Sequence, residues 1–242
     1  MLESRERREK AFADGLLEPE IYLSSLFSLK SLLEISKSKE WEEQKLAIQI
    51  LSEKADKESI KLLRKMLSHP EERPRLLSVM ALSIIERKYL KAIKVLKKEM
   101  AVDPSAISYQ KLGKAYFQFS LLFLESETLA NYYLKKAEKQ IKKGLKIEPK
   151  NIDSLYSFGL ILLEQKRFSE AEEIFQKVIK LSPSYSLPHF SLAKIYYQER
   201  DYKKVKEECS QYLSIIKKKE NPSKDEREIK EMAGFWVTPQ GQ

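Results

Sequence analysis

The sequence predicts an all-α protein, built as a right-handed α-solenoid of helical hairpins. Only 6 of its 242 residues are glycine, and Leu, Lys, Glu, Ile and Ala are abundant, which favours helices joined by short turns over a β-sheet. Hydrophobic residues make up 42% and charged residues 33%, as in a folded and well-solvated protein. A spacing of 34 residues recurs in the second half of the chain, which is typical of stacked repeats.

Residues 18–102 are expected to form HEAT-like helical hairpins, preceded by a charged N-terminal segment at 1–17. Their apolar periodicity has no 34-residue repeat but predicts paired helices, near 18–37, 40–54, 57–68, 73–87 and 89–101. Pro70 and Pro74 should end one helix and begin the next, because proline disfavours a helical conformation in the residue before it.

Residues 103–219 are expected to form three repeats, near 106–149, 152–185 and 186–219. Gly159 and Ala171 are small residues at positions 8 and 20 of the second repeat, and Ala193 is at position 8 of the third. Small residues there let two helices approach closely, while large apolar residues fill the remaining seam. Pro183 closes the second repeat because proline cannot continue a helix. These spacings resemble the tetratricopeptide repeat (TPR).

The first repeat departs from this pattern. It begins at Ala106 with Gly113 at position 8, but Ala137 reaches position 20 only if about twelve residues are inserted. Because the inserted residues keep a helical rhythm of apolar side chains, we expect them to extend both helices of the hairpin.

Residues 220–242 are predicted to be a polar C-terminal tail. The helical periodicity ends there, a short polar helix near 224–233 is expected, and the last residues are expected to be mobile. Within the tail, the GFWVTPQ segment is apolar, and we expect it to dock on the chain's own end or on a partner.

Several features indicate a cytoplasmic protein. The longest apolar stretches, such as 160–163, are far shorter than the roughly 18–20 residues that cross a bilayer. The first residues, MLESRERREK, do not resemble a secretion signal. Cys209 is the single cysteine, which excludes an internal disulfide and fits a reducing compartment; its helical position indicates a core residue.

The sequence does not indicate an enzyme. His69 and His189 are the only histidines, and neither has a cysteine, serine or histidine at the spacing of a metal site or catalytic triad. No glycine-rich phosphate-binding loop occurs. We therefore expect no catalytic residues, no metal and no cofactor.

The formal net charge of +9 leaves two further partners open. Seven lysines lie between 135 and 150 and six basic residues between 87 and 99, as on a nucleic-acid surface or a surface that contacts an anionic membrane. The lysines fall on polar helix faces and no aromatic residues interleave with them, which favours ordinary solvated faces. A basic helical-repeat protein that binds nucleic acid is the alternative function.

The inner groove of the repeats is the main candidate for binding other proteins. It is expected to be lined by the first helix of each repeat, because several groove positions there are large and apolar. The predicted groove residues are Gln110, Lys114, Phe117, Tyr156, Leu160, Leu163, Glu164, Phe190, Lys194, Tyr197 and Gln198. An equally open alternative is that these side chains pack inside the protein, on the inserted helices or on the tail.

The order of these parts resembles the PelE family of bacterial Pel exopolysaccharide synthesis and export. The resemblance spans about residues 10–213 and is carried by the segments KLLRKMLSHPEERPRLLSVMALSIIERK, KLGKAYFQFSLLFLESETLANYYLKKAE, LKIEPKNIDSLYSFGLILLEQKRF and HFSLAKIYYQERDYKKVKEE. It implies a non-enzymatic scaffold at the inner face of the cytoplasmic membrane that links a cyclic-di-GMP receptor and a membrane transporter to a cytosolic glycosyltransferase. The family normally has membrane-spanning helices before the repeats. This chain has none, so we expect either the soluble part alone or anchoring through a partner.

Overall fold

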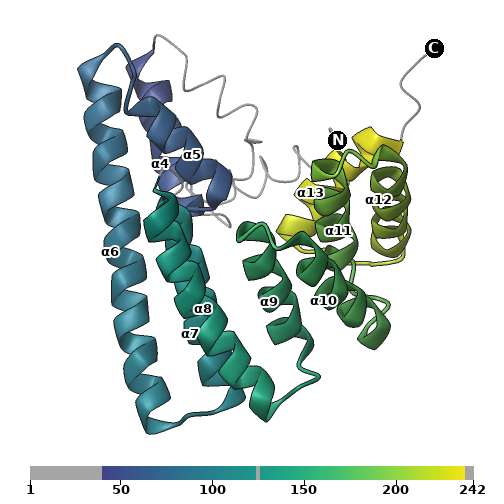
Figure 1. Cartoon of the computed structure of the whole chain (residues 1–242). Helices are drawn as coiled ribbons and strands as arrows, with labels where there is room; N and C mark the ends of the chain where they lie inside the picture. Colours follow the sequence, from purple (N-terminus) through teal and green to yellow (C-terminus); the bar gives the residue numbers. More distant parts are fainter. Residues whose placement is uncertain (1–39, 124–125, 238–242) are drawn as a thin grey trace, which may run out of the picture. The chain divides into compact units, whose positions relative to one another are not determined.

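The computed structural model describes residues 40–123 and 126–237, and all regular elements in these ranges are helices (Figure 1). The all-α solenoid class predicted from the sequence is confirmed. The chain divides into two compact units, residues 1–94 with 118–130 and residues 95–117 with 131–242. The elements are α4 (Trp41–Lys54), α5 (Lys57–Met66), α6 (Glu72–Val102), α7 (Ala106–Ser120), the 3-10 helix η1 (Leu121–Phe123), α8 (Glu127–Ile147), α9 (Ile152–Glu164), α10 (Phe168–Leu181), α11 (Leu187–Gln198), α12 (Tyr202–Lys217) and α13 (Lys224–Val237).

In the first unit, α4 and α5 form a tight hairpin. Ala55 takes a left-handed conformation with φ 46° and ends α4. Asp56 caps α5 because its side chain accepts a hydrogen bond from the Ser59 amide at 2.7 Å. The core of this hairpin contains apolar side chains that are fully buried, among them Leu51, Ile60 and Leu63.

The prediction of two helices near 73–87 and 89–101 is wrong, because α6 is one continuous helix of 31 residues. The segment after Pro74 contains no glycine or proline, and the charged residues Arg87 and Lys88 are good helix formers that do not interrupt a helix. The helix predicted near 18–37 and the charged segment 1–17 lie outside the described residues.

Helices α7 and α8 carry the inserted residues of the first repeat, most of which belong to the first unit. They have 15 and 21 residues, against 13 and 14 for α9 and α10, so the insertion lengthens both helices as expected. The two helices approach closely at Gly113, where an added Cβ would lie 2.7 Å from the Ile141 side chain.

The hairpins α9–α10 and α11–α12 are built alike. In each, the turn between the helices contains a residue with positive φ, Lys166 at 60° and Arg200 at 62°, which are 34 residues apart. Side-chain caps begin two of the helices: Asn151 accepts from the Ser154 amide, and Asp201 from the Lys204 amide. Because this turn conformation recurs after 34 residues, the two hairpins have equivalent backbone conformations at the turn.

The C-terminal tail differs from the expected short polar helix. Helix α13 extends to Val237 and covers the end of the third repeat: Ala233 is fully buried, and Ile229 and Val237 pack against the core there. Its apolar residues are spaced by four, which the abundance of charge around them obscured in the sequence. Of the GFWVTPQ segment, the side chains of Phe235 and Trp236 and everything after 237 lie outside the described residues.

Candidate protein-binding surface

The eleven predicted groove residues lie on the first helix of each repeat, all in the second unit. Helix α7 carries three, α9 carries four and α11 carries four: Gln110, Lys114 and Phe117, then Tyr156, Leu160, Leu163 and Glu164, then Phe190, Lys194, Tyr197 and Gln198. Their exposure divides them into buried, half-buried and exposed groups, so that they do not form one uniform surface.

Phe190 is a core residue and not an exposed groove residue. It is 8% exposed, its ring centroid lies 5.9 Å from that of the fully buried Tyr212, and the Lys194 ammonium lies 5.0 Å from its centroid. Helix α12 carries Tyr212 and thereby covers a position that the repeat pattern alone assigns to the groove.

The groove positions of the second repeat also pack within the unit. The ring of Tyr156 lies 5.8 Å from Phe175 and 5.2 Å from Tyr185, and its hydroxyl is 3.4 Å from Ser191 Oγ on α11. Leu160 and Leu163 are partly buried against the same core as these rings. These side chains of the second repeat therefore pack inside the unit, on α10, on α11 and on Tyr185.

An exposed pair of tyrosines lies at the turn between α11 and α12. Tyr197 is 49% exposed and Tyr202 is 53% exposed, and their rings meet edge to face with centroids 6.1 Å apart. Lys194 and Gln198 are exposed on the same face of α11. We call Tyr197 and Tyr202 the tyrosine pair.

Tyr202 was missed by the sequence analysis because it begins the second helix of the repeat and is not a groove position. The tight turn at Arg200, with its positive φ, brings it back against the end of α11. The signal in the sequence was the recurrence of an aromatic residue five positions after Tyr197, on the far side of the predicted turn.

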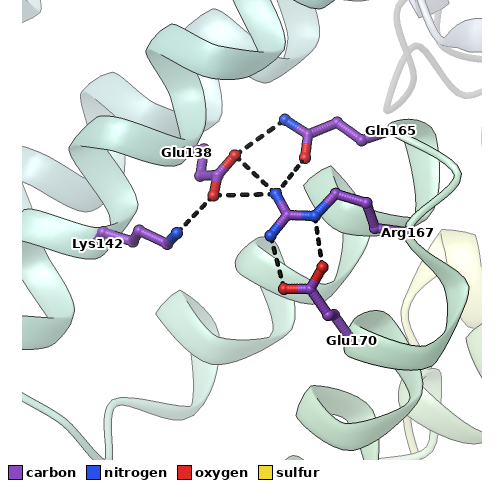
Figure 2. Close-up of polar contacts among 5 residues, drawn as sticks. All are labelled: Glu138, Lys142, Gln165, Arg167 and Glu170. Carbon is purple, nitrogen blue, oxygen red and sulfur yellow. Dashed lines mark hydrogen bonds and ion pairs between the residues drawn. The ribbon is translucent and has the colours of Figure 1, made fainter.

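A polar network connects the first repeat to the second, as Figure 2 shows. Arg167, in the turn between α9 and α10, donates hydrogen bonds to Glu138 on α8 at 3.1 Å and to Glu170 at 2.6–2.7 Å. Gln165 and Lys142 also contact the Glu138 carboxylate, at 3.0 and 2.6 Å. Burial by itself would raise the pKa of Glu138, but these donors hold it below its ordinary value. The network fixes how two successive repeats stack.

An open cleft of about 700 Å³ lies where α9 begins and α12 ends. It contains none of the eleven predicted residues; its lining includes Asp153, Tyr185, Lys218 and Lys219. Burial, with the nearby Tyr156 and acidic groups, raises the pKa of Tyr185, so this phenol stays neutral. Within the described ranges, no three His, Cys, Asp or Glu side chains are grouped to hold a metal ion.

Both histidines have contacts within the chain. Nδ1 of His189 lies 2.7 Å from Glu208 Oε2, and the imidazole is 9% exposed, so it is held inside the third repeat. His69 lies in the turn before α6, where its ring accepts from the Glu71 amide at 3.2 Å. Neither arrangement presents a nucleophile beside a base.

Lysines form an exposed stripe on α8, made of Lys135, Lys139, Lys142 and Lys146. Their spacing of four, three and four residues puts them on one helix face. This lysine stripe contains one short ion pair, from Lys142 to Glu138, and is otherwise on the solvent side of the helix.

Aromatic rings do lie beside the lysines of α8, contrary to the sequence analysis. The Lys136 ammonium is 4.3 Å from the centroid of Tyr132 and less than 6 Å from those of Tyr116 and Tyr133. Lys143 lies 5.5 Å from the centroid of Tyr109 in the same way. These rings come from other turns and from α7, so their proximity was not visible in the linear sequence. Because an ammonium covers a face of each ring, that face is not free to stack on a base.

Within the described residues, no helix is long and apolar enough to cross a membrane.

Comparisons with known proteins identify two kinds of repeat. A family model of HEAT repeats matches residues 29–109, and a model of the tetratricopeptide repeat matches residues 152–185. A curated relative, anaphase-promoting complex subunit 3 of Schizosaccharomyces pombe, is 22% identical over 121 residues, which are 50% of this chain and 16% of that protein. The chain thus matches only a small part of that relative.

Solved structures that resemble this chain share few identical residues with it. A crystal structure of a thermophilic TPR protein from Thermus thermophilus aligns with a TM-score of 0.52 and 18% identity, covering 86% of this chain and all of that chain. A structure of MamA from Desulfovibrio magneticus has a TM-score of 0.47 and 16% identity, covering 82% of this chain and 98% of that one. The first similarity supports the repeat fold.

Proposed function

We propose that this HEAT- and TPR-repeat protein is a non-enzymatic scaffold that binds other proteins, with the tyrosine pair at the centre of a docking surface. TPR proteins generally bind other proteins, and repeat folds of this kind are typically scaffolds. The observation that carries the proposal is the exposure of Tyr197 and Tyr202, at 49% and 53%, next to Lys194 and Gln198. Tyrosine offers a large rigid apolar ring and a polar hydroxyl, and it is enriched at the centres of protein interfaces.

The 34-residue register supports this choice of surface. The second-repeat positions equivalent to Tyr197 and Tyr202 are Leu163 and Phe168, and both pack against the core where the third repeat follows. At the third repeat the same two positions stay half exposed. A partner helix that stacks on the α11–α12 turn would cover the tyrosine pair as the third repeat covers its equivalents.

We further propose that the complex is a bacterial Pel-type exopolysaccharide synthesis and secretion assembly at the cytoplasmic face of the inner membrane. The support is the resemblance of about residues 10–213 to the PelE family. The partners would be a membrane transporter, a cyclic-di-GMP receptor and a cytosolic glycosyltransferase. The name of the curated relative describes a subunit of a multiprotein complex, and a role of that general kind is part of this proposal.

Affinity capture with the full chain tests both parts. The chain would be immobilised and exposed to detergent-extracted membranes and cytosol of its own bacterium, and bound proteins identified by mass spectrometry. Binding of the captured partner would then be measured for wild type, for Tyr197→Ala with Tyr202→Ala, and for Tyr132→Ala. Tyr132 is 51% exposed on α8 and is therefore a matched control.

We expect the double substitution to weaken binding at least tenfold, about 1.4 kcal/mol or more, and Tyr132→Ala to have little effect. Unchanged affinity in a folded double variant would remove the tyrosine pair from the docking surface. Recovery of partners that include no transporter, receptor or glycosyltransferase would reject the Pel-type assembly and leave the scaffold role standing.

The lysine stripe on α8 supports a second candidate, a basic helical-repeat protein that binds nucleic acid. Lys135, Lys139 and Lys146 are exposed on one face and can neutralise phosphates. Fluorescence anisotropy with single-stranded and duplex oligonucleotides between about 50 and 200 mM salt tests it. Binding that falls steeply with salt, and that is lost when these three lysines are changed to Gln, is expected from this candidate. No binding at the lowest salt concentration would exclude it.

A further inference from the structure

Helix α8 carries a high positive charge on its outer side. Residues 131–147 contain six lysines and one acidic residue, Glu138, which gives this part of the helix a net charge of +5. Four residues on the opposite side are buried: Leu134, Ala137, Ile141 and Gly144. The lysines are therefore confined to the solvent side, where the lysine stripe and Lys143 are exposed.

Neighbouring carboxylates do not neutralise this charge. Glu138 is already bound by Lys142 and Arg167. Among the described residues, no acidic side chain forms an ion pair with Lys135, Lys139 or Lys146. Helix α7, which forms a hairpin with α8, contains no aspartate or glutamate. Because like charges three and four residues apart on a helix repel, the lysine stripe costs stability that an anionic partner would recover.

Two large apolar side chains lie on the same side of α8 as the lysines. Tyr132 is 51% exposed and Ile147 is 53% exposed, and the 15 positions between them correspond to about 22 Å along the helix. Lys139 and Lys143 lie between them at spacings of seven, four and four residues, which keep all four side chains on one side. Lys136 Nζ lies 4.3 Å from the Tyr132 ring centroid, so ring and ammonium stay together. We call these four side chains and the lysine stripe the α8 basic face.

We infer that the α8 basic face binds the surface of an anionic phospholipid membrane. A negatively charged leaflet attracts clustered lysines, and each lysine near the surface strengthens binding by about fivefold. Lysine stems can lie along apolar surface while their ammonium groups stay in water, and tyrosine suits the same interface because its ring is apolar and its hydroxyl polar. Since the apolar side of α8 is buried in the protein, the helix lies on the headgroups and inserts only Tyr132 and Ile147.

Three features favour lipid over nucleic acid as the occupant. Every basic residue of α7 and α8 is a lysine, whereas the planar fork of arginine suits paired contacts to phosphates and base edges. An ammonium covers a face of Tyr116, Tyr132 and Tyr133, which removes that face from base stacking. Ile147 is exposed beside the lysines, and an aliphatic side chain gains free energy on leaving water for a membrane interface but not on contact with phosphates.

Vesicle binding of the full chain tests the inference. Sucrose-loaded vesicles of phosphatidylcholine, with and without phosphatidylglycerol, are sedimented with the protein between about 50 and 200 mM salt, a range over which surface charges become screened. The bound fraction gives a partition coefficient for wild type and for the α8 triple variant, which is Lys135→Gln with Lys139→Gln and Lys146→Gln. Circular dichroism confirms that each variant is folded. Wild type should bind only the vesicles that contain phosphatidylglycerol, and less at high salt.

A matched control removes the same charge from another helix. Lys203, Lys206 and Lys217 are exposed on one side of α12, and changing all three to Gln leaves α8 intact. We expect the α8 triple variant to lose about tenfold or more in affinity for phosphatidylglycerol vesicles, and this α12 triple variant less than about twofold. Equal losses would mean that net charge alone drives binding and would overturn the inference. Failure of wild type to bind at the lowest salt concentration would overturn it too.

Removing the two apolar side chains separates lipid from a purely electrostatic partner. Tyr132→Ser with Ile147→Ser keeps the charge and should weaken vesicle binding about threefold or more, because half-exposed apolar side chains lose their burial in the interface. Fluorescence anisotropy with oligonucleotides is measured on the same variants. Oligonucleotide binding that the α8 triple variant loses and the serine variant keeps, without vesicle binding, would assign the α8 basic face to nucleic acid and overturn the inference.

An environment-sensitive fluorophore shows which side of the protein meets the membrane. Cys209 is buried, so the label can be directed to an added surface cysteine, Ile147→Cys on α8 or Gln211→Cys on α12. Emission should shift to the blue with phosphatidylglycerol vesicles for the label at 147 and not for the label at 211. Equal shifts at both positions, or a shift at 211 alone, would overturn the inference. The inference does not depend on the proposed scaffold function, whose test measures the tyrosine pair on other helices.

Discussion

Replacing Gly159 with alanine should have two opposite effects on the stability of the fold. Removing a glycine from the interior of α9 stabilises the helix by about 0.8–1.0 kcal/mol. The new Cβ, however, would lie 2.5 Å from Cε1 of Phe175 and 2.9 Å from two further ring carbons. Phe175 is fully buried in a packed cluster, so its ring cannot move away without disturbing other side chains. Overpacking of this kind costs about 1–3 kcal/mol, so the net expectation is a destabilisation of up to about 2 kcal/mol.

Thermal unfolding followed by circular dichroism measures the result, with Gly234→Ala as control. The control makes the same substitution in α13, where no atom lies within 4 Å of the added Cβ, and it should raise Tm slightly. Gly159→Ala should lower Tm by several degrees, since 1 kcal/mol corresponds to about 2–4 °C for a chain of this size. Phe175→Leu added to Gly159→Ala should recover part of the loss, as a double-mutant cycle would show. A rise in Tm for Gly159→Ala would refute the close approach of α9 and α10 at this position.

Two further predictions concern a buried carboxylate of α13 and the buried thiol of the third repeat. Burial by itself would raise the pKa of Glu226, but hydrogen bonds from Lys219, the Ser223 amide and Ser186 keep it below its ordinary value of 4.5. Its ionised form therefore stabilises the fold above about pH 4.5. Glu226→Gln should lower Tm at pH 7, and this loss should shrink as the pH falls from about 5 to 3. A difference in Tm between wild type and variant that stays constant with pH would contradict this. Burial and nearby Glu208 raise the pKa of the Cys209 thiol to about 11, so a thiol reagent at pH 8 should react with it only after denaturation, and rapid reaction in the native protein would contradict its core position.

The helical repeats could be predicted because local patterns determine them. Gly159 and Phe175 stand at the repeat positions that the 34-residue spacing requires, and both meet in the structure where α9 crosses α10. The continuity of α6 is not apparent from the apolar periodicity, which fits two paired helices before and after Lys88 as well as it fits one long helix. Polarity alone does not end a helix, and the segment has no glycine or proline to do so.

The candidate surface was harder to predict because exposure depends on neighbours that are distant in sequence. Tyr212 buries Phe190 from 22 residues away, and Arg167 binds Glu138 from 29 residues away. The groove positions of a repeat specify where a side chain points, but not which later helix lies over it. For the same reason only Tyr197 of the tyrosine pair was predicted, because Tyr202 contacts it across a turn.

Helix α13 explains why the exposed surface lies at the α11–α12 turn. Each repeat of a solenoid buries its apolar face against the next, so the last repeat needs a cover of another kind. Here Ala233 is buried on that face, and the Tyr212 hydroxyl donates to the Glu226 carbonyl at 2.6 Å, which holds α13 in place. This cover protects the core of the third repeat and leaves Tyr197 and Tyr202 about half exposed. The docking surface that we propose at the tyrosine pair therefore belongs to a repeat whose core α13 already covers.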